Sequence, residues 1–139
     1  MKAQLTLLIA DRNSRVRKLL QREMTAEGYQ VRLAQNGREV IKKAFAYEPL
    51  DLIILDPDLP DSDALYLLKQ LQDRIPKLPI VVHAFASDYC DQMTTSSDVV
   101  FVEKCGDSVE RLKKVINDLL RKIRSPRTVA QENNIGVTH

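Results

Sequence analysis

A short apolar run that ends on an aspartate constrains the fold of this chain more than any other feature. The run covers residues 52–55, and Asp56 and Pro57 follow it directly. A continuous apolar run of this length, bounded by turn-forming residues, is typical of a strand that is buried on both faces of a parallel sheet. Asp56 then lies at the carboxyl end of that strand, where open α/β proteins bind their ligands. A carboxylate at this place is a nucleophile, a metal ligand or a helix cap.

Segments with strand and helix patterns alternate five times along the chain. Strands are predicted at residues 5–10, 29–33, 51–55, 80–84 and 99–103. Helices are predicted at residues 16–24, 40–45, 65–75, 87–95 and 109–123, of which the fourth has only a weak apolar pattern. Asn36 and Glu39 form a capping-box pattern at the start of the second helix. The alternation indicates an α/β fold, a doubly wound parallel sheet with five helices, and the flavodoxin-like strand order 2-1-3-4-5.

Length, charge and apolar content indicate a single domain without a nucleic-acid or membrane partner. The 139 residues fit one domain, and a net charge of +2 is too small to indicate direct binding to nucleic acid. No apolar run is long enough to span a membrane, and Cys90 and Cys105 show neither metal-site spacing nor a disulfide framework. We therefore expect a cytoplasmic protein with no membrane partner. Residues 4–123 are expected to form the domain, and residues 124–139, which lack apolar periodicity, a disordered tail.

The expected strand order brings charged residues from distant segments to one crevice. The first and third strands are neighbours in that order, so Asp11 and Asp56 lie side by side, and Lys104 follows the fifth strand at the same rim. Two adjacent carboxylates repel each other and require a cation or a proton. Mg²⁺ meets that requirement with oxygen ligands, and a lysine neutralises phosphoryl oxygens. Asp56 is then the expected nucleophile, which forms an aspartyl phosphate.

The order of the motifs over residues 5–120 resembles the receiver domain of two-component response regulators. Residues 52–61 resemble the phosphoacceptor segment, with Asp56 as acceptor, and residues 101–104 resemble the fifth strand with the family lysine at Lys104. The resemblance implies Asp11, Asp56 and Asp58 as the metal-site residues, with Asp58 contributing its backbone carbonyl. The sequence equally allows Asp58 to be a helix-capping or solvent-facing acid. It also implies phosphorelay signalling rather than enzymatic turnover, with a histidine kinase or another signalling protein as partner.

Three positions depart from the pattern of that family. Arg12 stands where a second acid is usual, and Cys105 stands where a proline usually follows the lysine. Arg12 removes a metal ligand and adds positive charge, so we expect Mg²⁺ binding to be weak. We hypothesise that the Arg12 guanidinium forks onto Asp56 or Asp11 and partly stands in for the metal.

The third departure concerns the conformational switch. Ala84 occupies the position of a switch hydroxyl, and Phe101 occupies the position of the switch aromatic residue. Without the hydroxyl, one link of the two-state element is missing. We therefore expect impaired switching and interpret Phe101 as a core residue.

The sequence leaves two other functions open. One is a phosphorylation-independent interaction module, or pseudo-receiver. The other is an aspartyl-phosphate phosphatase of the haloacid-dehalogenase type, which Asp56-Pro57-Asp58 resembles. It is less favoured because that motif normally opens the first strand, whereas here it closes the third, and because Leu59 and Pro60 stand where a hydroxyl residue is expected. His83 is interpreted as a structural residue. We expect a single-domain receiver that docks through its fourth helix, fifth strand and fifth helix, with homodimerisation undecided.

Overall fold

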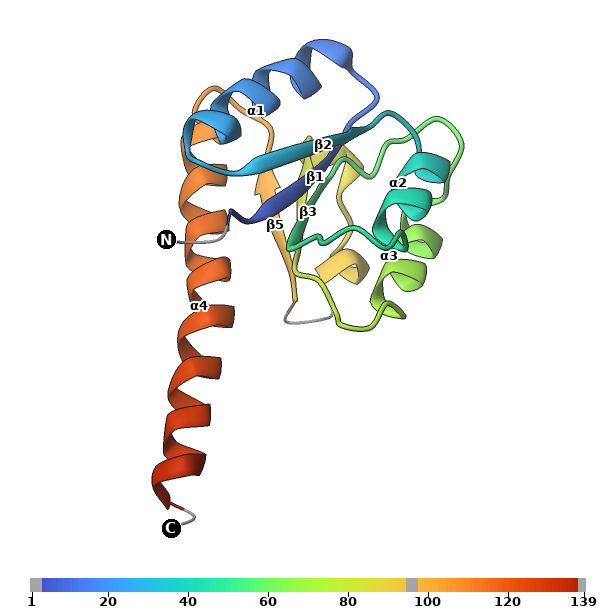
Figure 1. The fold of residues 1–139 in the computed structure, drawn as a ribbon. Coiled ribbons are helices and arrows are strands. Elements are labelled where there is room, and N and C mark those ends of the chain that lie inside the picture. The colour runs from blue at the N-terminus through green and yellow to red at the C-terminus, as the bar shows by residue number, and fades with distance from the viewer. Residues whose placement is uncertain (1–3, 95–97, 138–139) are drawn as a thin grey trace.

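The computed structural model describes residues 4–94 and 98–137, and the described chain forms one parallel five-stranded sheet. The strands are β1 (Thr6–Ala10), β2 (Gln30–Ala34), β3 (Leu52–Leu55), β4 (Ile80–Ala84) and β5 (Val99–Glu103). Their order in the sheet is β2-β1-β3-β4-β5, and every neighbouring pair is parallel (Figure 1). The flavodoxin-like order expected from the alternation is therefore confirmed.

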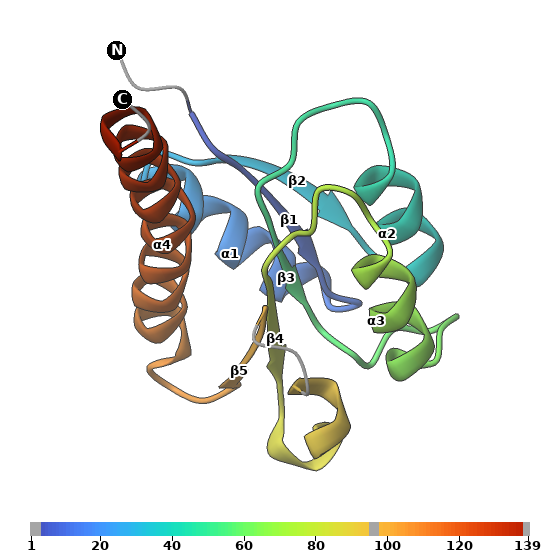
Figure 2. The same ribbon diagram turned by 90° about the horizontal axis from the view of Figure 1, so that it is seen from below.

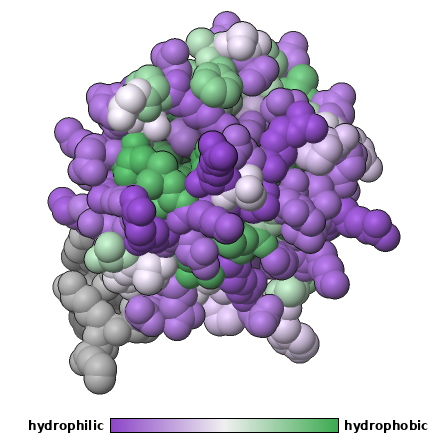
Figure 3. Space-filling view, turned by 90° about the horizontal axis from the view of Figure 1, so that it is seen from above, coloured by the Kyte–Doolittle hydropathy of each residue, from purple (hydrophilic) through white to green (hydrophobic). Residues whose placement is uncertain are grey.

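Helices cover both faces of the sheet. The helices are α1 (Ser14–Ala26), α2 (Gly37–Ala44), α3 (Ala64–Gln72) and α4 (Ser108–Val137). Figure 2 shows α1 and α4 on one face of the sheet, and α2 and α3 on the other. The face of the molecule seen in Figure 3 is mainly hydrophilic, with apolar patches between hydrophilic side chains. Two clusters of buried apolar side chains fill the layers between the sheet and its helices.

The central strands are apolar at every position because both of their faces are buried. Side chains of a strand alternate between the faces of a sheet. Ile53 and Leu55 accordingly pack in the cluster under α2 and α3, whereas Leu52 and Ile54 pack in the cluster under α1 and α4. All four are at most 1% exposed. This double burial explains why the run before Asp56 has no polar residue.

Side-chain caps define where the helices begin. The Asn36 Oδ1 atom accepts the Glu39 N–H at 2.8 Å, so the predicted cap of the second helix is confirmed. The Glu39 carboxylate accepts the N–H of Gln35 rather than that of Asn36, so the box closes one residue earlier than the pattern implies. Asn13 and Asp63 cap α1 and α3 in the same way.

The predicted fourth helix is absent from the described residues, so four α-helices replace the expected five. The described part of this segment, residues 87–94, contains two 3₁₀ turns instead, η1 (Ala86–Asp88) and η2 (Asp91–Thr94), and residue 95 lies outside the described residues. Ser and Asp side chains compete for backbone hydrogen bonds, and Met93 is the buried apolar anchor of this segment. Short 3₁₀ turns are the usual outcome where too little apolar surface supports a full helix.

The last helix is longer than the sequence pattern indicates. The pattern ends at residue 123, whereas α4 continues to Val137 and includes most of the segment expected to be a disordered tail. Residues 138–139 lie outside the described residues. The domain boundary at residue 123 stays a prediction.

Candidate functional site

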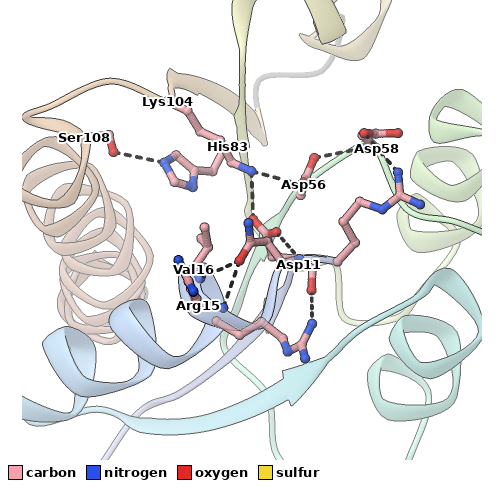
Figure 4. Close-up of polar contacts among 11 residues, drawn as sticks. Asp11, Arg15, Val16, Asp56, Asp58, His83, Lys104 and Ser108 are labelled. Carbon is pink, nitrogen blue, oxygen red and sulfur yellow. Dashed lines mark hydrogen bonds and ion pairs between the residues drawn. The ribbon is translucent and has the colours of Figure 1, made fainter.

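The sheet brings Asp11, Asp56 and Lys104 together at the carboxyl ends of three strands (Figure 4). Asp11 follows β1 and Asp56 follows β3, and the Asp56 N–H donates to the Ala10 carbonyl at 2.8 Å. Lys104 follows β5, and its N–H donates to the Ala84 carbonyl at 2.8 Å. The backbone hydrogen bonds of the sheet thus continue for one residue beyond each of these strands, and they fix the backbone of the three charged residues at the carboxyl edge of the sheet.

The Lys104 ammonium lies between the two carboxylates. Its Nζ atom is 2.9 Å from Asp11 Oδ2 and 3.0 Å from Asp56 Oδ2. Asp11 is 1% exposed and Asp56 is 5% exposed, so both ion pairs are shielded from solvent. The ammonium also lies 5.3 Å from the centre of the Phe85 ring, a cation–π distance. Asp11, Asp56 and Lys104 therefore lie together in one crevice, as the strand order predicts.

The second oxygen of each carboxylate is held by the backbone that follows it. Asp11 Oδ1 accepts the Asn13 N–H at 2.8 Å, and Asp56 Oδ1 accepts the Asp58 N–H at 2.9 Å. A side chain that accepts the N–H two residues further on forms an Asx turn. Both carboxylates are consequently fixed at both oxygens, one by Lys104 and one by backbone.

The protonation of the site follows from burial and pairing. Burial raises the pKa of Asp56 above its ordinary value, and the negative charge of Asp11 raises it further. The hydrogen bonds from the Asp58 N–H and from Lys104 lower this pKa, but the net direction is upward. Burial lowers the pKa of Lys104, but its hydrogen bonds to Asp11 and Asp56 outweigh this effect, so the net direction is upward. Lys104 therefore stays charged at neutral pH and is the cation that the two carboxylates require.

Arg12 pairs with Asp58, at the edge of the crevice. Its Nη1 atom is 3.4 Å from Asp58 Oδ2, and the two side chains are 49% and 54% exposed. The hypothesis that Arg12 forks onto Asp56 or Asp11 is wrong in this structure. Asp11 and Asp56 already have partners at both oxygens, whereas the Asp58 carboxylate extends toward solvent. An exposed pair of this kind contributes about 0–1 kcal/mol.

The two switch positions carry apolar side chains in contact with the core. Ala84 is fully buried at the end of β4. The Phe101 ring is half-buried, packs against the cluster under α2 and α3, and stacks on Tyr89 with ring centres 4.1 Å apart. Tyr89 was not singled out in the sequence, because the segment around it has no regular pattern.

A buried pair beneath the site was also missed. His83 Nε2 lies 3.2 Å from Ser108 Oγ, which joins β4 to the start of α4. Among the described residues, His83 Nδ1 is buried without a hydrogen-bond partner. Burial lowers the pKa of His83 to about 4, and the charge of Lys104 acts in the same direction. The imidazole is therefore neutral at pH 7, which fits the structural role expected for it.

A second missed contact anchors the loop that follows Asp56. The Asp61 carboxylate accepts the N–H groups of Gly37 and Arg38 at 2.7 Å and 3.1 Å, at the first turn of α2. These backbone hydrogen bonds, that of Gly37 first, lower the pKa of Asp61. A Cβ atom at position 37 would lie 1.6 Å from Ser62 Oγ and 2.8 Å from Ser62 Cβ, so Ser62 would have to move for any residue other than glycine. The loop after β3 is thereby tied to α2.

The described residues contain neither a clustered metal site nor a helix that could span a membrane. Within residues 4–94 and 98–137, no three or more His, Cys, Asp and Glu side chains gather in the manner of a metal site. In the same part of the chain, no helix has the combination of length and apolarity that a membrane span requires.

Known proteins share both the sequence pattern and the fold. Residues 7–122 match the family model of the response regulator receiver domain. The alkaline phosphatase synthesis transcriptional regulatory protein PhoP of Bacillus subtilis is 33% identical over 123 residues, which are 88% of this chain and 44% of that protein. The chain spans about half, or less, of the length of the curated relatives it matches.

Solved structures of response regulators also resemble this chain. Response regulator protein TrrA of Thermotoga maritima, in complex with Mg²⁺–BeF, is 26% identical with a TM-score of 0.73 over 84% of this chain and 99% of that one. TrrA in complex with the histidine kinase ThkA is 27% identical with a TM-score of 0.71 over the same shares. The family model covers most of the chain, and the strand order and the acidic crevice agree with it. The chain belongs to the response regulator receiver domain family of two-component signal transduction.

Proposed function

We propose that this receiver domain accepts a phosphoryl group on Asp56 and that its Mg²⁺ binding and conformational switching are impaired. The observation that carries the proposal is the buried Asp56 carboxylate, paired with Lys104 at 3.0 Å. A nucleophilic carboxylate beside a fixed cation is suited to phosphoryl transfer, because the cation stabilises charge on the phosphoryl oxygens. The domain acts in this proposal as a signalling module rather than as an enzyme.

The donor set supports weak binding of Mg²⁺. Asp11, Asp56 and the backbone carbonyl of Asp58 are the ligands implied by the family resemblance. Lys104 already pairs with one oxygen of each buried carboxylate, and Arg12 adds a second cation at the edge of the crevice. Mg²⁺ prefers several oxygen ligands in a regular octahedron, so this donor set fits the ion poorly.

A histidine kinase is the proposed phosphodonor. The support is the likeness to TrrA, which forms a complex with the kinase ThkA. We propose β5 and α4 as the output surface, together with the turns η1 and η2 that replace the expected fourth helix. The partner on that surface is a signalling protein.

Intact-protein mass spectrometry after incubation with acetyl phosphate tests the proposal. We expect one added phosphoryl group on the wild-type chain and none on Asp56→Asn, which preserves the size of the side chain. Lys104→Met should retain Asp56 but accept the phosphoryl group at least tenfold more slowly, since removal of one stabilising charge commonly costs a factor of about 10² or more. If Asp56→Asn is labelled as fast as the wild type, Asp56 is not the acceptor.

A phosphorylation-independent interaction module is the second candidate. Ala84 has no hydroxyl that could contact a phosphoryl group, and the Phe101 ring is already stacked on Tyr89. Both features favour a single conformation of the output surface. Binding of a captured partner with equal affinity to wild type, phosphorylated wild type and Asp56→Asn would favour this candidate over phosphorelay signalling.

A further inference from the structure

Arg12 is a weakly held cation next to a buried acceptor. Its side chain forms an ion pair with Asp58, at 3.4 Å between half-exposed side chains. Asp58 in turn donates its backbone N–H to Asp56 Oδ1 at 2.9 Å. Arg12 and Asp56 thus contact the same residue, one through its carboxylate and one through its backbone. Because an exposed pair contributes only about 0–1 kcal/mol, the guanidinium can leave Asp58 at little cost.

The charge of the crevice differs from that of a crevice with an acid at position 12. Asp11, Asp56 and Asp58 contribute three negative charges, and Lys104 and Arg12 contribute two positive ones, which leaves a net charge of −1. An acid in place of Arg12 would leave −3. The difference is two elementary charges, which is the charge of one divalent cation.

The guanidinium is also suited in shape to a phosphoryl group. It is always charged, and its planar fork donates two parallel N–H···O hydrogen bonds to phosphoryl oxygens. Lys104 is engaged by Asp11 and Asp56 at 2.9 Å and 3.0 Å, so it offers one fixed charge on the inner side of the crevice. Arg12 supplies a second positive charge on the outer side, where an incoming phosphoryl group meets solvent.

We propose that Asp56 accepts its phosphoryl group without a divalent cation, with Arg12 leaving Asp58 to bind the phosphoryl oxygens. The proposal rests on the function proposed above for Asp56. With an acyl phosphate as donor, an Asp56 carboxylate oxygen attacks phosphorus and a new O–P bond forms. The P–O bond to the acyl group breaks, and the carboxylate leaves with the bonding electron pair. No proton, oxidant or reductant is needed for this step.

The test compares phosphorylation by acetyl phosphate in EDTA and in Mg²⁺, followed by intact mass. Wild-type rates should agree within about threefold in the two buffers. Arg12→Asp should lose about 10²-fold in EDTA, the effect of losing one preorganised charge donor, and recover in Mg²⁺ because it gains a metal ligand. In EDTA, the phosphorylation rate of Arg12→Lys should lie between those of the wild type and of Arg12→Asp. Lys18→Asp makes the same change of charge on an exposed position of α1 and should behave as the wild type in both buffers.

The outcomes separate this inference from the proposed function. Wild-type phosphorylation in Mg²⁺ but not in EDTA would overturn metal independence and leave Asp56 as an acceptor. Equal rates of Arg12→Asp and wild type in EDTA would overturn the role of Arg12. No phosphorylation in either buffer would overturn the proposed function and this inference with it. Circular dichroism of each variant verifies that the fold is retained.

Discussion

Replacing Lys104 by methionine is expected to produce a pH-dependent loss of stability. The change removes the cation between Asp11 and Asp56 while keeping an unbranched apolar side chain. The Lys104 side chain is 12% exposed and the two carboxylate side chains are 2% and 6% exposed, so water cannot replace the missing charge. Removing one partner of a buried ion pair costs about 3–5 kcal/mol, and we expect a loss of about 3 kcal/mol in the free energy of unfolding at pH 7.5.

The direction in which the stability loss of Lys104→Met changes with pH follows from the pKa of Asp56. Burial already raises the pKa of Asp56, and loss of Lys104 removes a contribution that lowers it. A carboxyl whose pKa is higher in the folded state contributes stability that is present at low pH and lost as the pH rises through that pKa. The deficit of Lys104→Met should therefore shrink between pH 7.5 and pH 5, as the Asp56 carboxyl takes up a proton.

Urea denaturation of both chains at several pH values measures this effect. Asp56→Asn combined with Lys104→Met should recover most of the loss, because a single buried carboxylate no longer faces a like charge. Lys113→Met is the matched control. Lys113 pairs with Glu23 at 2.9 Å at the surface between α1 and α4, and the loss of this pair should destabilise the domain far less than Lys104→Met does, with no change from pH 7.5 to 5. A deficit of Lys104→Met that is the same at both pH values would show that the Asp56 carboxylate does not cause the loss.

Three further predictions concern contacts around the site. His83→Gln should remove a pH dependence: the pKa of His83 is about 4 when folded against 6.5 when unfolded, so the imidazole contributes about 3 kcal/mol that is present above pH 6.5 and lost as the pH falls toward 4. Urea denaturation from pH 4 to 7.5 checks this, and parallel curves for variant and wild type would contradict it. Gly37→Ala should destabilise the domain by about 1–3 kcal/mol through its contact with Ser62, and Ser62→Gly should relieve most of that loss in the double variant, measured by thermal unfolding. Asn36→Ala should cost about 1 kcal/mol at the start of α2, with a smaller effect for Asn36→Asp, which keeps a capping oxygen.

The sequence was sufficient for the sheet because its signal is local and repetitive. Strands buried on both faces, such as residues 52–55, carry continuous apolar runs, and their alternation with helical patterns leaves few topologies. Asp11, Asp56 and Lys104 could be placed together for the same reason, since the carboxyl ends of parallel strands share one edge of the sheet.

The remaining features depend on side-chain contacts between distant segments. His83 and Ser108 are 25 positions apart, and Gly37 and Asp61 are 24 apart, so no periodic pattern marks either pair. The partner of Arg12 depends on which carboxylates are already satisfied, which only the assembled crevice determines. The fourth helix failed as a prediction because residues 87–95 have too little apolar surface to support a helix against the sheet.

We propose that Asp56 is a phosphoacceptor and that Lys104 holds its carboxylate in place. The most direct measurement is peptide mapping by mass spectrometry of the wild-type chain after exposure to acetyl phosphate, with Asp56→Asn treated in parallel. We expect a single phosphoryl group on the peptide that contains Asp56 and none on the variant. An unmodified Asp56 peptide in the wild type, in both Mg²⁺ and EDTA, would contradict this proposal.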